Sequence, residues 1–278
     1  MTGNTQTSAL GTDAIGENKQ HPLLLVAEGL HVLNQQVRAA MTGRNEQVLV
    51  EIARLHLAHG ARALAVNLGP GRAMAELTPW VMETLSRELS VPLFVSAGVL
   101  AHPELLRRHG ANLTINAVTA DPDTLPRALA LAKECGNNLV VLLVRPGLTP
   151  AGSSDRLALA AAVIDQALRA DFPLPRLYLD PVLTLRPDPH ALRISRGVPD
   201  LAPVAETICQ LRQLDGVRTI AALGNCGRET GLQARALAVL AEAGLEAVIV
   251  NGQDPGLLRT RQDLAGGRQP TATIFRAA

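Results

Sequence analysis

The stretch LQARALAVLAEAGLEAVIVN (residues 232–251) contains one complete unit of the fold. Its first part has leucine and alanine at helical spacing and ends at Gly244, a residue type that commonly follows the last turn of a helix. The apolar run Ala247–Val250 comes next and predicts a buried strand, and Asn251 stands where that strand ends. The order is helix, glycine, strand and polar residue.

The same unit recurs along the chain. Amphipathic stretches such as Glu46–Gly60, Thr124–Gly136 and the alanine-rich helix that starts at Ser153 alternate with short apolar runs, a pattern typical of parallel βα units. The predicted strands are Leu23–Ala27, Ala63–Leu68, Pro92–Val95, Asn112–Ile115, Leu139–Val144, Leu177–Leu179, Thr219–Leu223 and Ala247–Val250. Eight such units favour an α/β fold consisting of a single closed (β/α)8 TIM barrel. An open doubly wound sheet is disfavoured because no GxGxxG or GxxxxGK[ST] turn occurs.

Length and composition limit the possible classes of protein. The 278 residues are 47% apolar and 18% charged, enough for one large core without a membrane-spanning run. We expect a flexible leader over residues 1–20 and the barrel over residues 21–278. A net charge of +1 and 2% aromatic residues argue against nucleic acid as a partner. Three widely spaced cysteines indicate neither a disulfide framework nor a zinc site, so we expect a cytoplasmic protein.

Polar residues follow the predicted strands, at the end of a barrel where active sites lie. They are Glu28, Asn67, Ser96, Asn116, Arg145, Asp180, Asn225 and Asn251. This set is rich in neutral amides and poor in His and Cys, which suits a hydrogen-bonded heterocycle better than a metal ion. Each residue also has a plain structural alternative, because Asn, Asp and Ser are common turn and cap residues. Asp180 precedes Pro181, for example, and fits an Asp-Pro turn or an acceptor for a ring N–H pair.

Four further residues have structural alternatives to a functional role. His56 and His59 lie near a predicted helix end, where an imidazole can bond exposed carbonyl groups. Cys226 follows Asn225 without a histidine near it in sequence, so we interpret it as a packed thiol rather than a nucleophile. Arg228 fits either a surface cap or the anionic tail of a substrate.

Several strand ends, taken in order, carry a family resemblance. The segments are NLGP (67–70), INA (115–117), SSDRLALA (153–160), LYLDP (177–181), GN (224–225) and AGLEAVIVNGQD (243–254). Together they resemble the pterin-binding barrel family, and within it the methyltetrahydrofolate:corrinoid protein methyltransferases. The resemblance extends from about Val26 to Asp254.

This resemblance implies a site and a reaction. The pterin ring of methyltetrahydrofolate, or of a related pterin, is expected in the barrel mouth on Asp180, Asn116 and Asn225. Asn225 is the predicted catalytic residue, because its amide can stabilise the ring nitrogen as the methyl group leaves for cobalt. The cobalamin belongs to a partner corrinoid protein, no metal is expected on this chain, and a homodimer is expected. The remaining predicted binding residues are Ser96, Asn67, Glu28, Gly224, Arg228 and Asn251.

The sequence also departs from the family pattern. Ala65 and Ser96 stand where the methyltransferases carry aspartate, and Asn251 replaces another aspartate by an amide. One alternative is a dihydropteroate synthase-like enzyme, which needs cations for a pyrophosphate, here Arg186 and Arg228. Another is a catalytically degenerate pterin-binding subunit. Folate and methanopterin both fit, as do both directions of methyl transfer.

Overall fold

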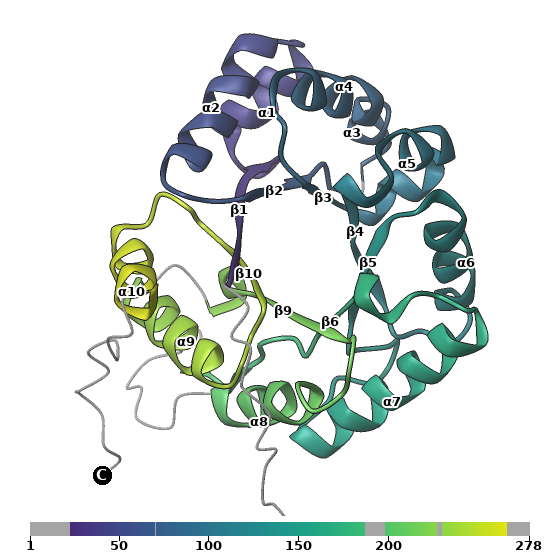
Figure 1. Cartoon of the computed structure of the whole chain (residues 1–278). Coiled ribbons are helices and arrows are strands. Elements are labelled where there is room, and N and C mark those ends of the chain that lie inside the picture. Colours follow the sequence, from purple (N-terminus) through teal and green to yellow (C-terminus); the bar gives the residue numbers. More distant parts are fainter. Residues whose placement is uncertain (1–22, 70, 187–197, 227–229, 266–278) are drawn as a thin grey trace, which may run out of the picture.

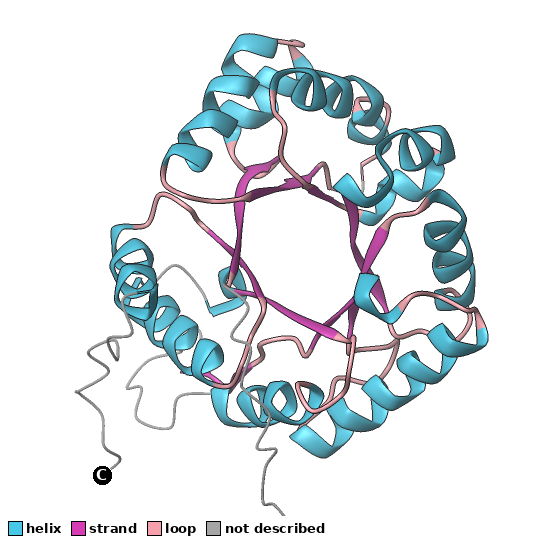
Figure 2. Ribbon diagram, in the orientation of Figure 1, coloured by secondary structure: helices cyan, strands magenta, loops and turns pink. Residues whose placement is uncertain are grey.

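The computed structural model describes residues 23–69, 71–186, 198–226 and 230–265 of the chain. Within these ranges eight parallel strands close into a barrel in the order β1-β10-β9-β6-β5-β4-β3-β2. Helices form a ring around the barrel (Figures 1 and 2). The predicted single (β/α)8 barrel is confirmed. The expected leader, residues 1–20, lies outside the described residues.

Each predicted strand is present in the barrel, although some bounds differ. The barrel strands are β1 (Leu24–His31), β2 (Ala63–Asn67), β3 (Leu93–Val95), β4 (Leu113–Thr119), β5 (Asn138–Leu142), β6 (Leu177–Asp180), β9 (Arg218–Ala222) and β10 (Ala247–Val250). The predicted ends of β1 and β4 are too early. In both strands the register shifts at the predicted end, between Ala27 and Leu30 and between Ile115 and Val118. A bulge of this kind interrupts the alternation of side chains while the strand continues.

The helices begin and end largely where their caps are. They are α1 (Gln35–Thr42), α2 (Glu46–Ala58), α3 (Arg72–Ala75), α4 (Thr78–Glu88), α5 (Pro103–His109), α6 (Leu125–Cys135), α7 (Ser153–Arg169), α8 (Leu201–Leu211), α9 (Thr230–Glu242) and α10 (Pro255–Ala265). Asn34 and Asn45 accept bonds from the first backbone N–H groups of α1 and α2. Gly136 ends α6 in the left-handed conformation, with φ 78°. Within the described ranges, no helix is long and apolar enough to cross a membrane.

Side chains fill the inside of the barrel. The interior cluster is Val26, Ala63, Ala65, Phe94, Val140, Tyr178, Ile220, Ala247 and Ile249. The Tyr178 ring meets Phe94 edge to face at 6.0 Å between centroids. Arg218, at the start of β9, lies 5.4 Å from the centre of the Tyr178 ring and donates to its hydroxyl at 2.8 Å. This stack fills the interior from Arg218, where β9 begins, to the layer of Tyr178 and Phe94. Active sites of such barrels lie at the other end, where the strands end, and that end is here called the mouth.

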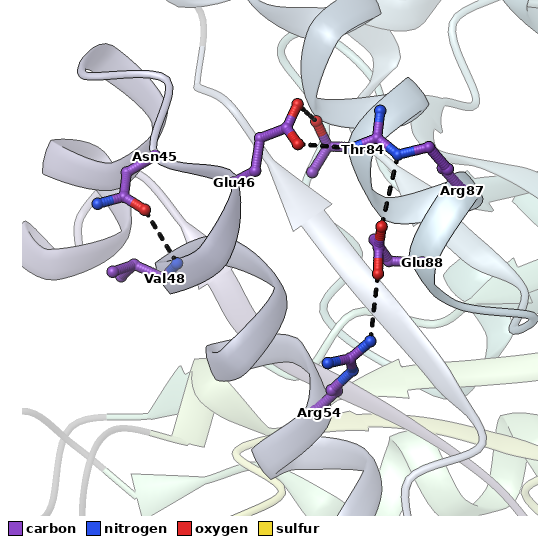
Figure 3. A network of polar contacts seen from close by, with 7 residues as sticks. All are labelled: Asn45, Glu46, Val48, Arg54, Thr84, Arg87 and Glu88. Carbon is purple, nitrogen blue, oxygen red and sulfur yellow. Dashed lines mark hydrogen bonds and ion pairs between the residues drawn. The ribbon is translucent and has the colours of Figure 1, made fainter.

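Ion pairs join neighbouring helices of the outer ring. Between α2 and α4, Glu46 pairs with Arg87, and Arg54 pairs with Glu88 at 3.2 Å (Figure 3). Arg87 also contacts Glu88 on its own helix, and Thr84 bonds Glu46 at 3.4 Å. These charges are exposed, and an exposed pair typically contributes only about 0.2–1 kcal/mol. The network therefore aligns two helices more than it stabilises the fold.

The connection from β6 to α8 was not predicted. It contains a two-stranded antiparallel ribbon, β7 (Leu185–Arg186) with β8 (Val198–Pro199). The connection starts where β6 ends and leads to the first residue of α8, so it belongs to the loops of the mouth. Both strands are too short for a periodic pattern to predict them.

Candidate functional site

Most of the predicted site residues lie two positions after residues of the interior cluster on the same strands. Side chains two residues apart share a face of a strand, and Val26, Ala65 and Tyr178 all lie inside the barrel. The side chains one layer closer to the mouth are Glu28, Asn67 and Asp180, with Ser96, Asn116 and Asn251 at the same spacing on β3, β4 and β10. The mouth thus brings together two carboxyl groups, a hydroxyl group and several amides from different strands.

Asp180 is the most buried carboxyl group of this set, with 3% of the residue exposed. Burial raises the pKa of Asp180 to about 7, and the bond that its Oδ1 accepts from Val182 N, at 2.8 Å, acts in the opposite direction. A carboxyl group with this pKa is present in both forms near neutral pH. It can therefore accept a hydrogen bond from a ligand or supply a proton to one.

Glu28 is the second carboxyl group of the mouth. Burial raises the pKa of Glu28 to about 6. Its carboxylate faces Gly224, in the 3-10 turn η4 (Leu223–Cys226) that follows β9. A β-carbon at residue 224 would lie 3.0 Å from Glu28 Oε2, so this approach depends on glycine. Titratable groups with raised pKa values in one opening are a common feature of active sites.

The amides of the mouth fall into two groups. Asn67 Oδ1 accepts from Gly69 N at 2.9 Å, and Asn251 Oδ1 accepts from Gln253 N at 3.1 Å, so both oxygens hold local turns. The structural alternative therefore accounts for the oxygens of these two residues. Neither Asn116 nor Asn225 has a side-chain hydrogen bond within the described part of the chain, which leaves both amides available to a ligand.

Ala65, where the resembled family has aspartate, belongs to the interior layer below the mouth. It is 8% exposed and pairs in register with Phe94, so it packs in the barrel core. Ser96 directly follows β3 and is partly exposed. Of the three missing aspartates, those replaced by Ser96 and Asn251 thus lie in the layer that a ligand in the mouth can contact.

Other sequence predictions have different outcomes. Cys226 is 3% exposed, and burial raises the pKa of its thiol to about 11, as expected of a packed thiol. Arg145 lies in an exposed turn with Leu148 after β5. Arg228 lies outside the described residues. Within the described ranges no three His, Cys, Asp or Glu side chains gather as metal ligands.

The helix-end role predicted for the two histidines holds for one of them. His59 Nδ1 bonds the Leu55 carbonyl at 2.7 Å at the end of α2. For His56 the prediction is wrong, because its ring is buried between Gly29 in the bulge of β1 and Gly252 after β10. Burial lowers the pKa of His56, which favours the neutral ring.

Sequence reasoning missed two residues at this end of the barrel. His31 pairs in register with Asn67 and so shares its face, but the early predicted end of β1 excluded it. Arg156, in α7, is fully buried against the residues after β6. From sequence, an arginine in the first turn of a helix is expected at the surface. Only the structure shows that Arg156 is buried and contacts Pro181.

Comparison with known proteins finds solved structures of the same fold. No protein-family model matches the chain. Dihydropteroate synthase from Xanthomonas albilineans in complex with 7,8-dihydropteroate is 16% identical with a TM-score of 0.62, over 88% of this chain and 94% of that one. The Yersinia pestis enzyme with a pterine-sulfa conjugate is 14% identical with a TM-score of 0.60, over 90% and 95%.

Two further solved structures are similar. Dihydropteroate synthase from Clostridium difficile, in the presence of pteroic acid, is 11% identical with a TM-score of 0.61, over 91% of this chain and 100% of that one. Phospho-2-dehydro-3-deoxyheptonate aldolase from Thermotoga maritima is 11% identical with a TM-score of 0.56, over 90% and 70%. At these identities the likeness establishes the barrel fold, which enzymes of different activity share.

Proposed function

We propose that the mouth of this barrel binds a reduced pterin and that the protein is a pterin-dependent transferase. The observation that carries the proposal is Asp180, a buried carboxyl group at the end of β6 with one oxygen bonded to Val182 N. The amino-pyrimidine edge of a pterin presents adjacent N–H donors, and a carboxyl group inside an apolar opening is a suitable acceptor for them.

The surroundings of Asp180 support a flat heterocycle. Tyr178 and Phe94 form an apolar layer directly below the mouth. Asn116 and Asn225 each offer a donor and an acceptor, which suits the mixed hydrogen-bonding edges of a pterin. The similar synthases were solved with a pterine conjugate, with 7,8-dihydropteroate and with pteroic acid, and their barrels match this chain over nearly its whole length.

Two transfer reactions fit such a site, and the comparisons with solved structures favour the first. A dihydropteroate synthase-like enzyme joins an aminobenzoate to a pterin and displaces pyrophosphate. That leaving group needs cationic partners. Arg145 supplies one cation on a loop of the mouth. The other candidates are Arg186 in β7 and Arg228, which lies outside the described residues.

The second reaction is methyl transfer from methyltetrahydrofolate to the cobalt of a corrinoid protein. The observation that favours it is Asn225, a neutral amide on the short turn after β9, with Glu28 approaching the same turn. A tertiary amine leaves poorly unless it is protonated or strongly hydrogen-bonded. An amide can stabilise the ring nitrogen through the change, and carboxyl groups with pKa values of about 6 and 7 can exchange protons near neutral pH.

Parallel assays of the purified full chain separate these reactions. One assay supplies a pterin pyrophosphate and aminobenzoate and measures dihydropteroate. The other supplies methyltetrahydrofolate and a corrinoid protein with reduced cobalt and measures methylcobalamin. Turnover in one assay assigns the reaction. Tight pterin binding without turnover in either would favour a binding subunit, and the absence of binding to any reduced pterin would reject the proposal.

A further inference from the structure

Arg156 is fully buried at the start of α7, although arginine is among the residues least often buried. Its guanidinium group donates to oxygen atoms of the residues that follow β6 and of the residue that precedes α7. The bonds are from Nε to Pro181 O at 2.8 Å, from Nη1 to Gly152 O at 3.0 Å, and from Nη2 to Val182 O and Thr184 Oγ1, both at 3.4 Å. Arg156 thus ties α7 to the residues that follow Asp180.

Packing alone does not explain an arginine at this position. Burial lowers the pKa of Arg156, while the carboxylates of Asp200 and Asp155 act in the opposite direction and favour its charged form. An apolar side chain of similar size would fill the same volume without the cost of burying a charge. The planar set of donors, which matches several carbonyl groups at once, is what arginine adds.

The segment that Arg156 holds contains a strained residue. Val182 has φ 57°, in the left-handed region that a β-branched side chain rarely adopts. Its N–H donates to Asp180 Oδ1 at 2.8 Å, and its carbonyl group accepts from Arg156. Such a conformation persists only where the surroundings fix it. Here the bonds come from Asp180 on the barrel side and from Arg156 on the helix side.

The β6–α8 connection is fixed at the same place. Thr184, whose hydroxyl group accepts from Arg156, also accepts through its carbonyl oxygen from Asp200 N at 2.9 Å. Asp200 directly precedes α8. One guanidinium group therefore contacts the strained turn and the base of the loop that leads from the mouth to α8.

We propose that Arg156 is a positioning residue, which holds the strained Pro181–Val182 turn so that Asp180 keeps one carboxyl oxygen on Val182 N and presents the other to the mouth. Arg156 acts through the main chain and does not itself reach the ligand. The consequence for pterin binding depends on the proposed function. The consequence for the turn does not, and it can be measured on the protein without ligand.

Amide hydrogen exchange tests the turn directly. In Arg156→Met we expect the Val182 N–H to exchange at least about tenfold faster than in the wild type, because the turn relaxes and loses its bond to Asp180. Tyr178→Phe is the matched control, since Tyr178 lies in the same strand as Asp180 and the change removes the bond that its hydroxyl group accepts from Arg218 of β9. It should leave the Val182 exchange rate unchanged. If Arg156→Met does not fold, Arg156→Lys, which keeps the charge and loses the planar donor set, replaces it.

Val182→Gly provides a rescue that a merely structural arginine would not show. Glycine adopts a φ of 57° without strain, so the turn depends less on Arg156 in this background. We expect Arg156→Met to weaken binding of 7,8-dihydropteroate about tenfold or more in the wild-type background and clearly less beside Val182→Gly. An equal loss in both backgrounds would contradict the positioning role.

The outcomes separate this inference from the proposed function. Unchanged Val182 exchange in the Arg156 variants, with only a lower unfolding temperature, overturns the positioning role whatever the protein binds. Faster Val182 exchange in a protein that binds no reduced pterin supports the positioning role and rejects the proposed function. Faster exchange together with unchanged pterin affinity would show that the position of Asp180 does not matter to binding, and so would overturn the inference.

Discussion

Glu28 and Gly224 approach each other across the mouth of the barrel, with Glu28 Oε2 3.0 Å from the position that a β-carbon of residue 224 would occupy. Glu28 comes from β1 and Gly224 from the turn after β9, and β10 lies between those strands. The contact therefore joins β1 to the turn after β9 through a carboxylate, and Asn225 directly follows Gly224 in that turn.

Gly224→Ala tests whether this approach matters for binding. The new methyl group would displace the Glu28 carboxylate, which is the free end of a side chain, so we expect the free energy of unfolding to fall by only about 1 kcal/mol. Pterin affinity should fall more clearly, in a fluorescence or calorimetric titration. Gly98→Ala is the control, since a β-carbon there has no neighbour within 4 Å. Wild-type affinity in Gly224→Ala would show that the approach has no role in binding.

Gly29→Ala tests the bulge that carries Glu28 into the mouth. A β-carbon at residue 29 would lie 1.6 Å from His56 Nε2, so the ring must move. We expect a loss of about 1–3 kcal/mol in the free energy of unfolding, measured with denaturant.

His56→Ala supplies the second arm of a double-mutant cycle. Removing the ring should make room for the methyl group, so Gly29→Ala should cost less in the His56→Ala background than in the wild type. Strictly additive costs for the two changes would mean that the contact between residue 29 and His56 does not constrain the bulge.

Asp180→Asn tests the raised pKa of the buried carboxyl group. The pKa of Asp180 is about 7 in the folded protein, and an aspartate exposed to solvent has a pKa of about 3.8. The folded state therefore keeps the proton to a higher pH than the unfolded state does. Its contribution to stability is present below about pH 4 and is lost as pH rises through about 7.

The stability of Asp180→Asn relative to the wild type should depend on pH, because only the wild type loses the contribution of Asp180 as pH rises. Asparagine does not titrate, and Glu28 is present in both proteins, so the stability of Asp180→Asn relative to the wild type should increase from pH 5 to pH 8. Between these pH values only the two units from pH 5 to the folded pKa of about 7 contribute, so at ~1.4 kcal/mol for each unit the increase should be about 3 kcal/mol. Denaturant unfolding at both pH values measures it, and a constant difference between the two proteins would contradict a raised pKa.

Asn225→Ala tests the methyl-transfer form of the proposal. Removing one hydrogen bond that forms in the transition state typically lowers kcat by about a hundred- to a thousandfold. We expect that loss in transfer to a corrinoid protein, with a smaller change in KM, measured by steady-state kinetics. A variant with near wild-type kcat would remove Asn225 from the catalytic role.

Periodicity was sufficient to predict the barrel, because alternating helices and apolar runs reflect the faces that the fold buries. It placed Asp180 correctly at the end of β6. It could not locate the bulges after Ala27 and Ile115, where the strands continue with a shifted register, and so it missed His31.

Periodicity also could not predict contacts between residues far apart in the sequence. His56 looks like a helix-end residue until Gly29 and Gly252 are placed against its ring. Arg156 looks like an ordinary charge in the first turn of a helix, and only the turn after Asp180 explains its burial. Both side chains are fixed by long-range packing, which a local pattern does not contain.

The binding of a reduced pterin by wild-type protein and by Asp180→Asn tests the central claim most directly. Titration with 7,8-dihydropteroate and with methyltetrahydrofolate should give saturable binding of at least one of them. Asparagine replaces one carboxylate oxygen by an NH2 group, which donates and cannot accept from a ring N–H, and it removes the negative charge. Affinity should therefore fall about 10- to 150-fold, equivalent to about 1.5–3 kcal/mol. Saturable binding that is equally tight in both proteins, or no binding of either pterin by the wild type, would contradict the account.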